Sequence, residues 1–197
     1  MSAERIRNAA LLRFAAQGYD GTSLAEIAGD VGIKTPSIYS HFVGKEALFR
    51  QLVEYAADRE LALVRDRLLR PVPVRAAIRE YLFDTVERFT GEPHLRFWLR
   101  SIYLPPAGMR DEISSRDREF AAALEGIVAA ALRHPEFGLP APALPCETLT
   151  AAFIGILRST HAELLYCDSG SATVLPAMWT VFELALGPVS QGPTCEE

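Results

Sequence analysis

The sequence predicts an all-α protein, and three observations indicate this. Apolar residues recur at spacings of three and four, and few runs alternate between apolar and polar residues as half-buried strands do. Glycine and proline residues divide the chain into about nine segments of helical length. Hydrophobic residues make up 49% and charged residues 23% of the 197 residues, a composition that supports a buried core.

The N-terminal helices have clear start and stop signals. The first helix is predicted over residues 4–17, where Ile6, Ala10 and Phe14 share a face and Gly18 follows as the stop. Two short helices are predicted over residues 23–31 and 35–42.

Longer helices follow, and most end close to a proline or glycine. They are predicted over residues 45–69, 74–89, 93–103, 111–133, 147–166 and 173–186. Ser169–Ser171 is interpreted as a turn between the last two helices, and the residues after Gly187 as a disordered tail.

The charge distribution is more informative than the total. A net charge of −5 does not resemble a nucleic-acid-binding protein, but residues 1–50 carry +1 and the remainder −6. Both lysines of the chain, Lys34 and Lys45, fall within those first fifty residues. The sequence therefore allows an N-terminal segment that binds DNA.

Several function classes are not favoured. Cys146, Cys167 and Cys195 are odd in number and lack CxxC spacing, which argues against a zinc site or a disulfide framework. We expect no metal and no cofactor. The chain has no P-loop, HExxH or GxSxG motif and no GxGxxG after a strand, so we expect no enzyme. It has no apolar run of about 18 residues and no apolar signal core, so we expect a cytoplasmic protein that does not enter a membrane.

A helix-turn-helix is indicated by two helix starts separated by a glycine. Ser23 with Glu26 forms a capping-box pattern, in which each side chain accepts a hydrogen bond from the other residue's amide. Thr35 can cap the next helix, with Pro36 at its first position. Gly32 permits a left-handed turn between them.

The two faces of this motif differ in chemistry. Its apolar face can form a small core with the neighbouring helices, through Phe14, Leu24, Ile27, Ala28, Val31, Ile33, Ile38, Phe42, Leu48 and Phe49. The other face of the second helix carries Thr35, Ser37, Tyr39, Ser40 and His41. Hydrogen-bonding side chains of this kind suit phosphates and base edges in a major groove.

Residues 4–52 resemble the N-terminal domain of the TetR family of bacterial regulators. The matching residues are Ile6, Ala9-Ala10, Phe14, Gly18-Tyr19, Thr22-Ser23, Ile27-Ala28, Val31-Gly32-Ile33, Ser37-Ile38-Tyr39, His41-Phe42, Lys45-Glu46 and Leu48. Arg13 departs from the pattern, because an apolar residue is common there.

The resemblance implies a role for each candidate DNA contact. Thr22, Tyr39 and Lys45 correspond to phosphate-contacting positions. Lys34, Thr35, Pro36, Ser37 and Ser40 lie on the part of the recognition helix that faces bases, and His41 can reach either. The implied domains are a DNA-binding domain over 1–50 and a helical ligand-binding and dimerisation domain over 51–197.

The second domain is expected to bind a small, largely apolar effector. The resemblance places an effector cavity among the middle helices, and the predicted contacts are Phe97, Trp98, Tyr103 and His161. A buried aromatic stripe is also typical of a core, so that alternative stays open.

The resemblance implies a homodimer, in which the last two helices meet those of a second copy as a four-helix bundle. Ala151, Ala152 and Gly155 form a strip of small residues that allows such close approach. Closure of an intramolecular core is the alternative.

These features predict a ligand-responsive repressor that leaves a pseudo-palindromic operator on double-stranded DNA when an effector tilts the helix over 45–69. Activation instead of repression, an architectural DNA-binding protein without an effector, and an enzyme on a helical scaffold are the alternatives.

Overall fold

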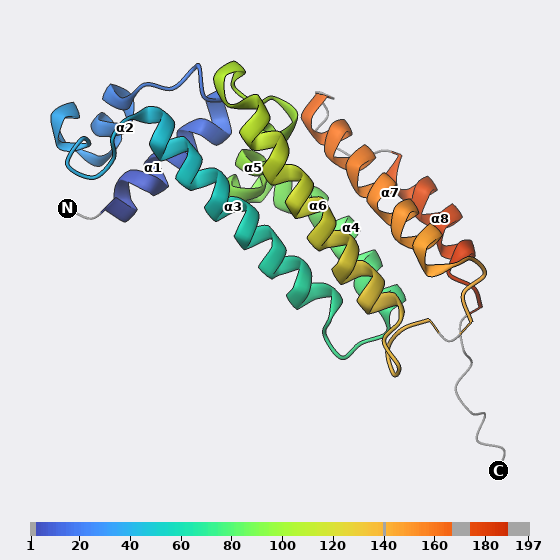
Figure 1. Ribbon diagram of the computed structural model, residues 1–197. Coiled ribbons are helices and arrows are strands. Elements are labelled where there is room, and N and C mark those ends of the chain that lie inside the picture. The colour runs from blue at the N-terminus through green and yellow to red at the C-terminus, as the bar shows by residue number, and fades with distance from the viewer. Residues whose placement is uncertain (1–2, 140, 167–173, 189–197) are drawn as a thin grey trace, which may run out of the picture. The chain divides into compact units, whose positions relative to one another are not determined.

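The computed structural model describes residues 3–139, 141–166 and 174–188, and within these ranges all of its regular secondary structure is helical (Figure 1). The predicted all-α class is confirmed. The α-helices are α1 (Ala3–Gln17), α2 (Leu24–Val31), α3 (Lys45–Leu68), α4 (Val74–Gly91), α5 (Pro93–Tyr103), α6 (Arg110–Leu132), α7 (Cys146–Tyr166) and α8 (Leu175–Ala185). Two 3₁₀-helices, η1 (Thr35–Ser37) and η2 (Ala107–Met109), complete the set.

The predicted helix over 35–42 is wrong in type. Only η1 forms there, and turns follow it up to His41. The amides of Ser37 and Ile38 donate to the carbonyls three residues earlier, at 2.9 and 3.0 Å, which is the 3₁₀ pattern. Serine side chains compete for backbone groups here, since the Ser40 hydroxyl donates to the Ser37 carbonyl at 2.8 Å. The segment is therefore wound more tightly than an α-helix.

Other predicted boundaries lie close to the observed ones. α5 has the predicted bounds, and α3 ends one residue earlier than expected. The half-buried Cys146 begins α7. Cys167, Cys195, the predicted turn at Ser169–Ser171 and the tail from residue 189 lie outside the described residues.

The chain divides into two compact units. Unit 1 contains the described residues up to Ala62 together with Glu87–Ala121, and unit 2 contains Leu63–Val86 and the described residues from Ala122 onward. The boundary falls within α3, α4 and α6. Unit 1 thus joins the helix-turn-helix to α5 and the first part of α6, although these segments are distant in sequence.

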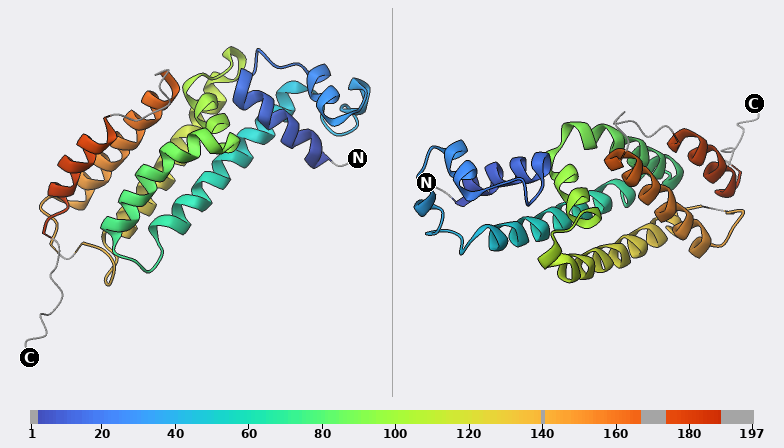
Figure 2. Two further views of the ribbon diagram at one scale, coloured as in Figure 1. Left: turned by 180° about the vertical axis from the view of Figure 1, so that it is seen from behind. Right: turned by 90° about the horizontal axis from the view of Figure 1, so that it is seen from above.

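Unit 1 has an aromatic core. α1 lies against α5 and α2 (Figure 2). The Phe49 ring lies 5.1 Å from that of Phe14 and 5.3 Å from that of Phe97, with both pairs edge to face. Leu48 and Ile38 are fully buried beside them. Eight of the ten residues predicted for the core of the helix-turn-helix are buried, whereas Leu24 and Ile33 are half-buried. The core extends onto α5 through Phe97.

Unit 2 pairs α7 with α8 and packs Tyr81 of α4 on Phe153 of α7 at 6.2 Å between ring centroids. One side of each of the last two helices carries exposed small or apolar residues. These are Ala151, Ala152 and Gly155 on α7, and Val181 and Leu184 on α8, which are 71% and 76% exposed. None of the described helices is both long and apolar enough to cross a bilayer.

Candidate nucleic-acid interface

The start of α2 is fixed by the predicted capping box. The Glu26 amide donates to Ser23 Oγ at 3.2 Å, and the Ser23 amide donates to Glu26 Oε2 at 2.8 Å. Hydrogen bonds from the backbone and hydroxyl of Ser23 lower the pKa of Glu26, with a smaller contribution from Arg13. The carboxylate form therefore stabilises the helix start.

Arg13, which departs from the family pattern, connects α1 to α2. Its Nη1 donates to Glu26 at 2.9 Å, and its Nε and Nη2 donate to the two oxygens of Asp30 at 2.5 and 2.9 Å. The guanidinium lowers the pKa of Asp30. An apolar side chain at this position would make none of these contacts. Arg13 therefore fixes α2 to α1 from the surface.

The turn after α2 requires glycine. Gly32 has φ +73°, in the left-handed region that side-chain-bearing residues rarely adopt. This conformation lets the Ile33 amide donate to the Ala28 carbonyl at 2.9 Å and close the helix end. The chain can then enter η1.

The recognition segment presents polar side chains on one side and buries the other. Ile38 is fully buried and Phe42 is 4% exposed, so these two anchor the segment to the core of unit 1. Lys34, Pro36, Ser37, Tyr39, Ser40 and His41 are exposed, and Thr35 is half-buried. Tyr39 in particular is 57% exposed although it is aromatic. Seven of the nine predicted DNA contacts therefore share a surface that is open to a large partner.

Thr22 and Lys45 have intramolecular partners instead. Thr22 is 2% exposed, and its hydroxyl donates to the Gly18 carbonyl at 2.9 Å. Lys45 Nζ donates to the carbonyls of Tyr19 and Thr22 at 2.9 and 3.0 Å and lies 4.0 Å from the centroid of the Tyr19 ring. Lys45 therefore holds the α1–α2 turn against the start of α3. Sequence reasoning missed this role, because a lysine 26 residues from its acceptor leaves no local pattern.

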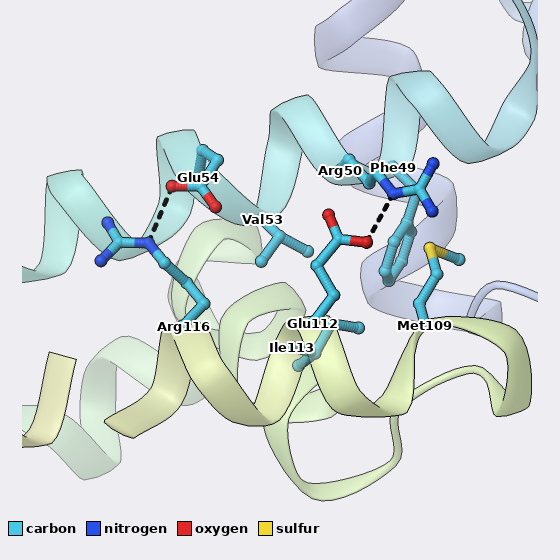
Figure 3. A pocket seen from close by; sticks show the side chains of 8 residues that line it. All are labelled: Phe49, Arg50, Val53, Glu54, Met109, Glu112, Ile113 and Arg116. Carbon is cyan, nitrogen blue, oxygen red and sulfur yellow. Dashed lines mark hydrogen bonds and ion pairs between the residues drawn. The ribbon is translucent and has the colours of Figure 1, made fainter. Parts of the chain in front are cut away.

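Ion pairs connect α3 to the start of α6 within unit 1 (Figure 3). Arg50 of α3 pairs with Glu112 of α6 at 2.7 Å, and Arg116 of α6 pairs with Glu54 of α3 at 2.8 Å. Apolar side chains line the same pocket as these pairs: Phe49, Val53, Met109 and Ile113. The helix that begins at Lys45 is therefore held by α6 through reciprocal charges.

The four predicted effector contacts differ from one another in burial and in the unit to which they belong. Phe97 and Trp98 are 1% exposed, and Trp98 packs on Phe120 at 5.1 Å between ring centroids. Tyr103 is half-buried at the end of α5. His161 is 8% exposed and belongs to α7 of unit 2. Phe97 lines a cavity of about 40 Å³ in unit 1.

Comparison with known proteins identifies the N-terminal domain. Residues 6–52 match the family model described as bacterial regulatory proteins of the TetR family. Over these residues the chain is similar to the regulatory domain that this family shares. The family match covers α2, η1 and the start of α3, and most of α1.

Relatives and solved structures agree with this assignment. The HTH-type transcriptional repressor ComR of Escherichia coli K12 is 32% identical over 84 residues, which span 42% of this chain and 40% of ComR. The regulator FadR of Bacillus subtilis, solved with stearoyl-CoA, has a TM-score of 0.66 at 16% identity, covering 95% of this chain and 100% of FadR. AibR, solved with isovaleryl coenzyme A and operator DNA, has a TM-score of 0.63 at 18% identity, covering 94% of this chain and 98% of AibR. The solved structures show that this chain shares their fold.

Proposed function

We propose that this protein is a DNA-binding transcriptional regulator, acting as a repressor that a small, largely apolar effector releases from a pseudo-palindromic operator. The observation that carries the proposal is the exposed polar surface over residues 34–41, on a TetR-family domain whose opposite side is buried. We place the protein in the cytoplasm, where such DNA is found.

Within the proposed complex, the nine DNA contacts differ in whether they contact bases or phosphates. Lys34, Thr35, Pro36, Ser37 and Ser40 face base edges, Tyr39 contacts a phosphate, and His41 reaches either. Lys45 uses two of its three N–H donors internally, which leaves one for a phosphate. Thr22 reaches a phosphate only by giving up its hydrogen bond to Gly18, so it is the weakest of the nine candidates.

Effector binding is supported by the solved relatives, since FadR and AibR were each crystallised with an acyl coenzyme A. We assign Phe97, Trp98, Tyr103 and His161 as effector contacts. The effector repacks the middle helices and tilts α3, whose first residue holds the α1–α2 turn. The ion pairs from α6 to Arg50 and Glu54 provide a route for that movement within unit 1.

A homodimer through α7 and α8 completes the proposal. Small residues on α7 and the exposed Val181 and Leu184 on α8 form a surface that water solvates poorly. Its burial against a second copy would place two recognition segments on one duplex with two-fold symmetry. The rival hypothesis, an architectural protein without an effector, predicts DNA affinity that depends on salt but not on sequence.

The function is tested with a duplex recovered by selection from random DNA. Replacement of Thr35 and Ser37 by alanine is expected to weaken binding by about 5- to 150-fold for each base that is no longer recognised. Ser114→Ala, an exposed change on α6 away from both proposed interfaces, is the matched control. Fluorescence anisotropy measures both variants, and equal affinities would contradict the assigned interface.

The effector part is tested separately with stearoyl-CoA and isovaleryl-CoA as probes. Either probe should weaken operator binding, and operator should weaken the binding of that probe by the same factor. Unchanged operator affinity at saturation with both probes would exclude the acyl coenzyme A class.

A further inference from the structure

Arg100, on the last turn of α5, lacks the partners that buried or half-buried arginines normally have. Its Nε is buried and donates to no described residue. No described carboxylate forms an ion pair with its guanidinium, whereas Arg13, Arg50 and Arg116 in the same unit are each paired. A buried donor without an acceptor costs free energy, and its presence in a native fold calls for a ligand or a function.

The Arg100 side chain lines a cavity of about 40 Å³ within unit 1. A single water needs at least about 10–15 Å³ of such space, so the cavity holds a group of about three heavy atoms. The remaining wall residues are Phe14, Gly18, Tyr19, Phe49, Phe97, Ser101, Leu104 and Pro106. They come from α1 and the turn after it, α3, α5 and the linker that follows α5.

The walls of this cavity select the charge of its occupant. Four aromatic residues line the cavity together with Arg100, whose planar guanidinium can donate two parallel hydrogen bonds, the geometry that matches a carboxylate. Ser101 is 2% exposed, and its hydroxyl already donates to the Phe97 carbonyl at 2.8 Å. A phosphate dianion would keep uncompensated charge among the rings, which is costly. Burial raises the pKa of Tyr19, so its hydroxyl adds no competing negative charge at neutral pH.

We propose that this cavity binds the carboxylate group of a small organic anion, with Arg100 as the residue that recognises it. The bound group would touch the end of α1 and Tyr19, the residue whose carbonyl and ring hold Lys45. Occupancy therefore stabilises unit 1 in the arrangement that positions the recognition segment. Only this effect on DNA rests on the proposed function, whereas anion binding does not.

Thermal denaturation of the full chain tests anion binding at this cavity. Because no DNA is present, a negative result counts against the anion site and not against the proposed function. Wild-type protein is compared in acetate, phosphate and chloride at equal ionic strength and pH 7. Acetate at ten times its Kd should raise Tm by about 3–6 °C above the value in chloride. Phosphate should not reproduce the rise.

Substitutions at two positions of α5 distinguish binding at this site from a general effect of charge. Arg100→Met should abolish the acetate-dependent rise, and Arg100→Lys should reduce it because lysine cannot donate two parallel hydrogen bonds. Arg96→Met is the matched control, because the Nε of Arg96 is likewise buried without an acceptor but Arg96 does not line the cavity. This variant should keep the full rise.

The proposal is overturned by any of three results: no acetate-dependent rise in the wild type, an equal rise in phosphate, or a rise that persists in Arg100→Met. Saturation-transfer NMR on acetate with the wild-type protein gives a second measurement that needs no variant. Formate fits the cavity and benzoate is too large for it, so formate should displace acetate more readily. An equal loss of the acetate signal with benzoate and with formate would also contradict the proposal.

Discussion

Replacement of Lys45 by methionine separates a structural role from a DNA-contacting one. Methionine keeps an unbranched apolar stem but removes the ammonium that donates to the Tyr19 and Thr22 carbonyls. It also removes the positive charge 4.0 Å from the Tyr19 ring centroid. The turn between α1 and α2 is then no longer connected to the start of α3.

The cost can be worked from these contacts. Hydrogen bonds from a charged donor contribute about 1.5–3 kcal/mol when buried, and about 1 kcal/mol each is reasonable for a half-buried lysine. The ring contact adds about 0.5–1 kcal/mol. A decrease of about 2.5–3 kcal/mol in the free energy of unfolding lowers Tm by about 5–12 °C in a chain of this length.

Lys34→Met is the matched control for thermal denaturation. Lys34 is exposed, and no described residue forms an ion pair with it, so its Tm should stay within about 2 °C of wild type. Equal Tm values for the wild type and Lys45→Met would refute the reasoning. If the third N–H of Lys45 contacts a phosphate in both protomers, Lys45→Met removes two phosphate contacts. The plot of log K for DNA binding against log salt concentration should then be less steep by about 1.8.

Three further predictions concern the caps, charges and last helices. Ser23→Ala removes the N-cap of α2 and should lower Tm by about 2–4 °C, and an unchanged Tm would show that the cap contributes nothing. Arg13 lowers the pKa of Asp30, so this ion pair stabilises the fold above the unfolded pKa, and the stabilisation disappears as pH falls through the folded pKa. The Tm difference between wild type and Arg13→Met should therefore shrink below about pH 4, and a difference that grows on acidification would contradict this. Leu184→Glu charges the exposed side of α8 and should turn a dimer into a monomer in sedimentation velocity, whereas an unaltered dimer would place the interface elsewhere.

Local signals in the sequence predicted much of the helix-turn-helix. The capping box of Ser23 and the glycine turn at Gly32 depend on residues within a few positions of each other, so both could be recognised and both are confirmed. The second helix of the motif was predicted as α-helix, because apolar spacing over eight residues does not distinguish an α-helix from a 3₁₀ turn.

Long-range contacts could not be predicted in the same way. Arg13 was noted as a departure from the family pattern, but its partners Glu26 and Asp30 depend on how α1 crosses α2. The contacts of Lys45 and the unpaired state of Arg100 likewise depend on tertiary packing. Of the nine predicted DNA contacts, Thr22 is buried, Thr35 and Lys45 are half-buried and the other six are exposed. Their roles on DNA stay predictions.

The central claim, that the first fifty residues read a specific DNA sequence as part of a dimer, is tested most directly by selection of bound duplexes from a random pool. The account predicts enrichment of one pseudo-palindromic consensus whose half-sites lie one helical turn, or a multiple of it, apart. Enriched duplexes that share no motif, recovered with affinity that depends only on salt, would contradict it.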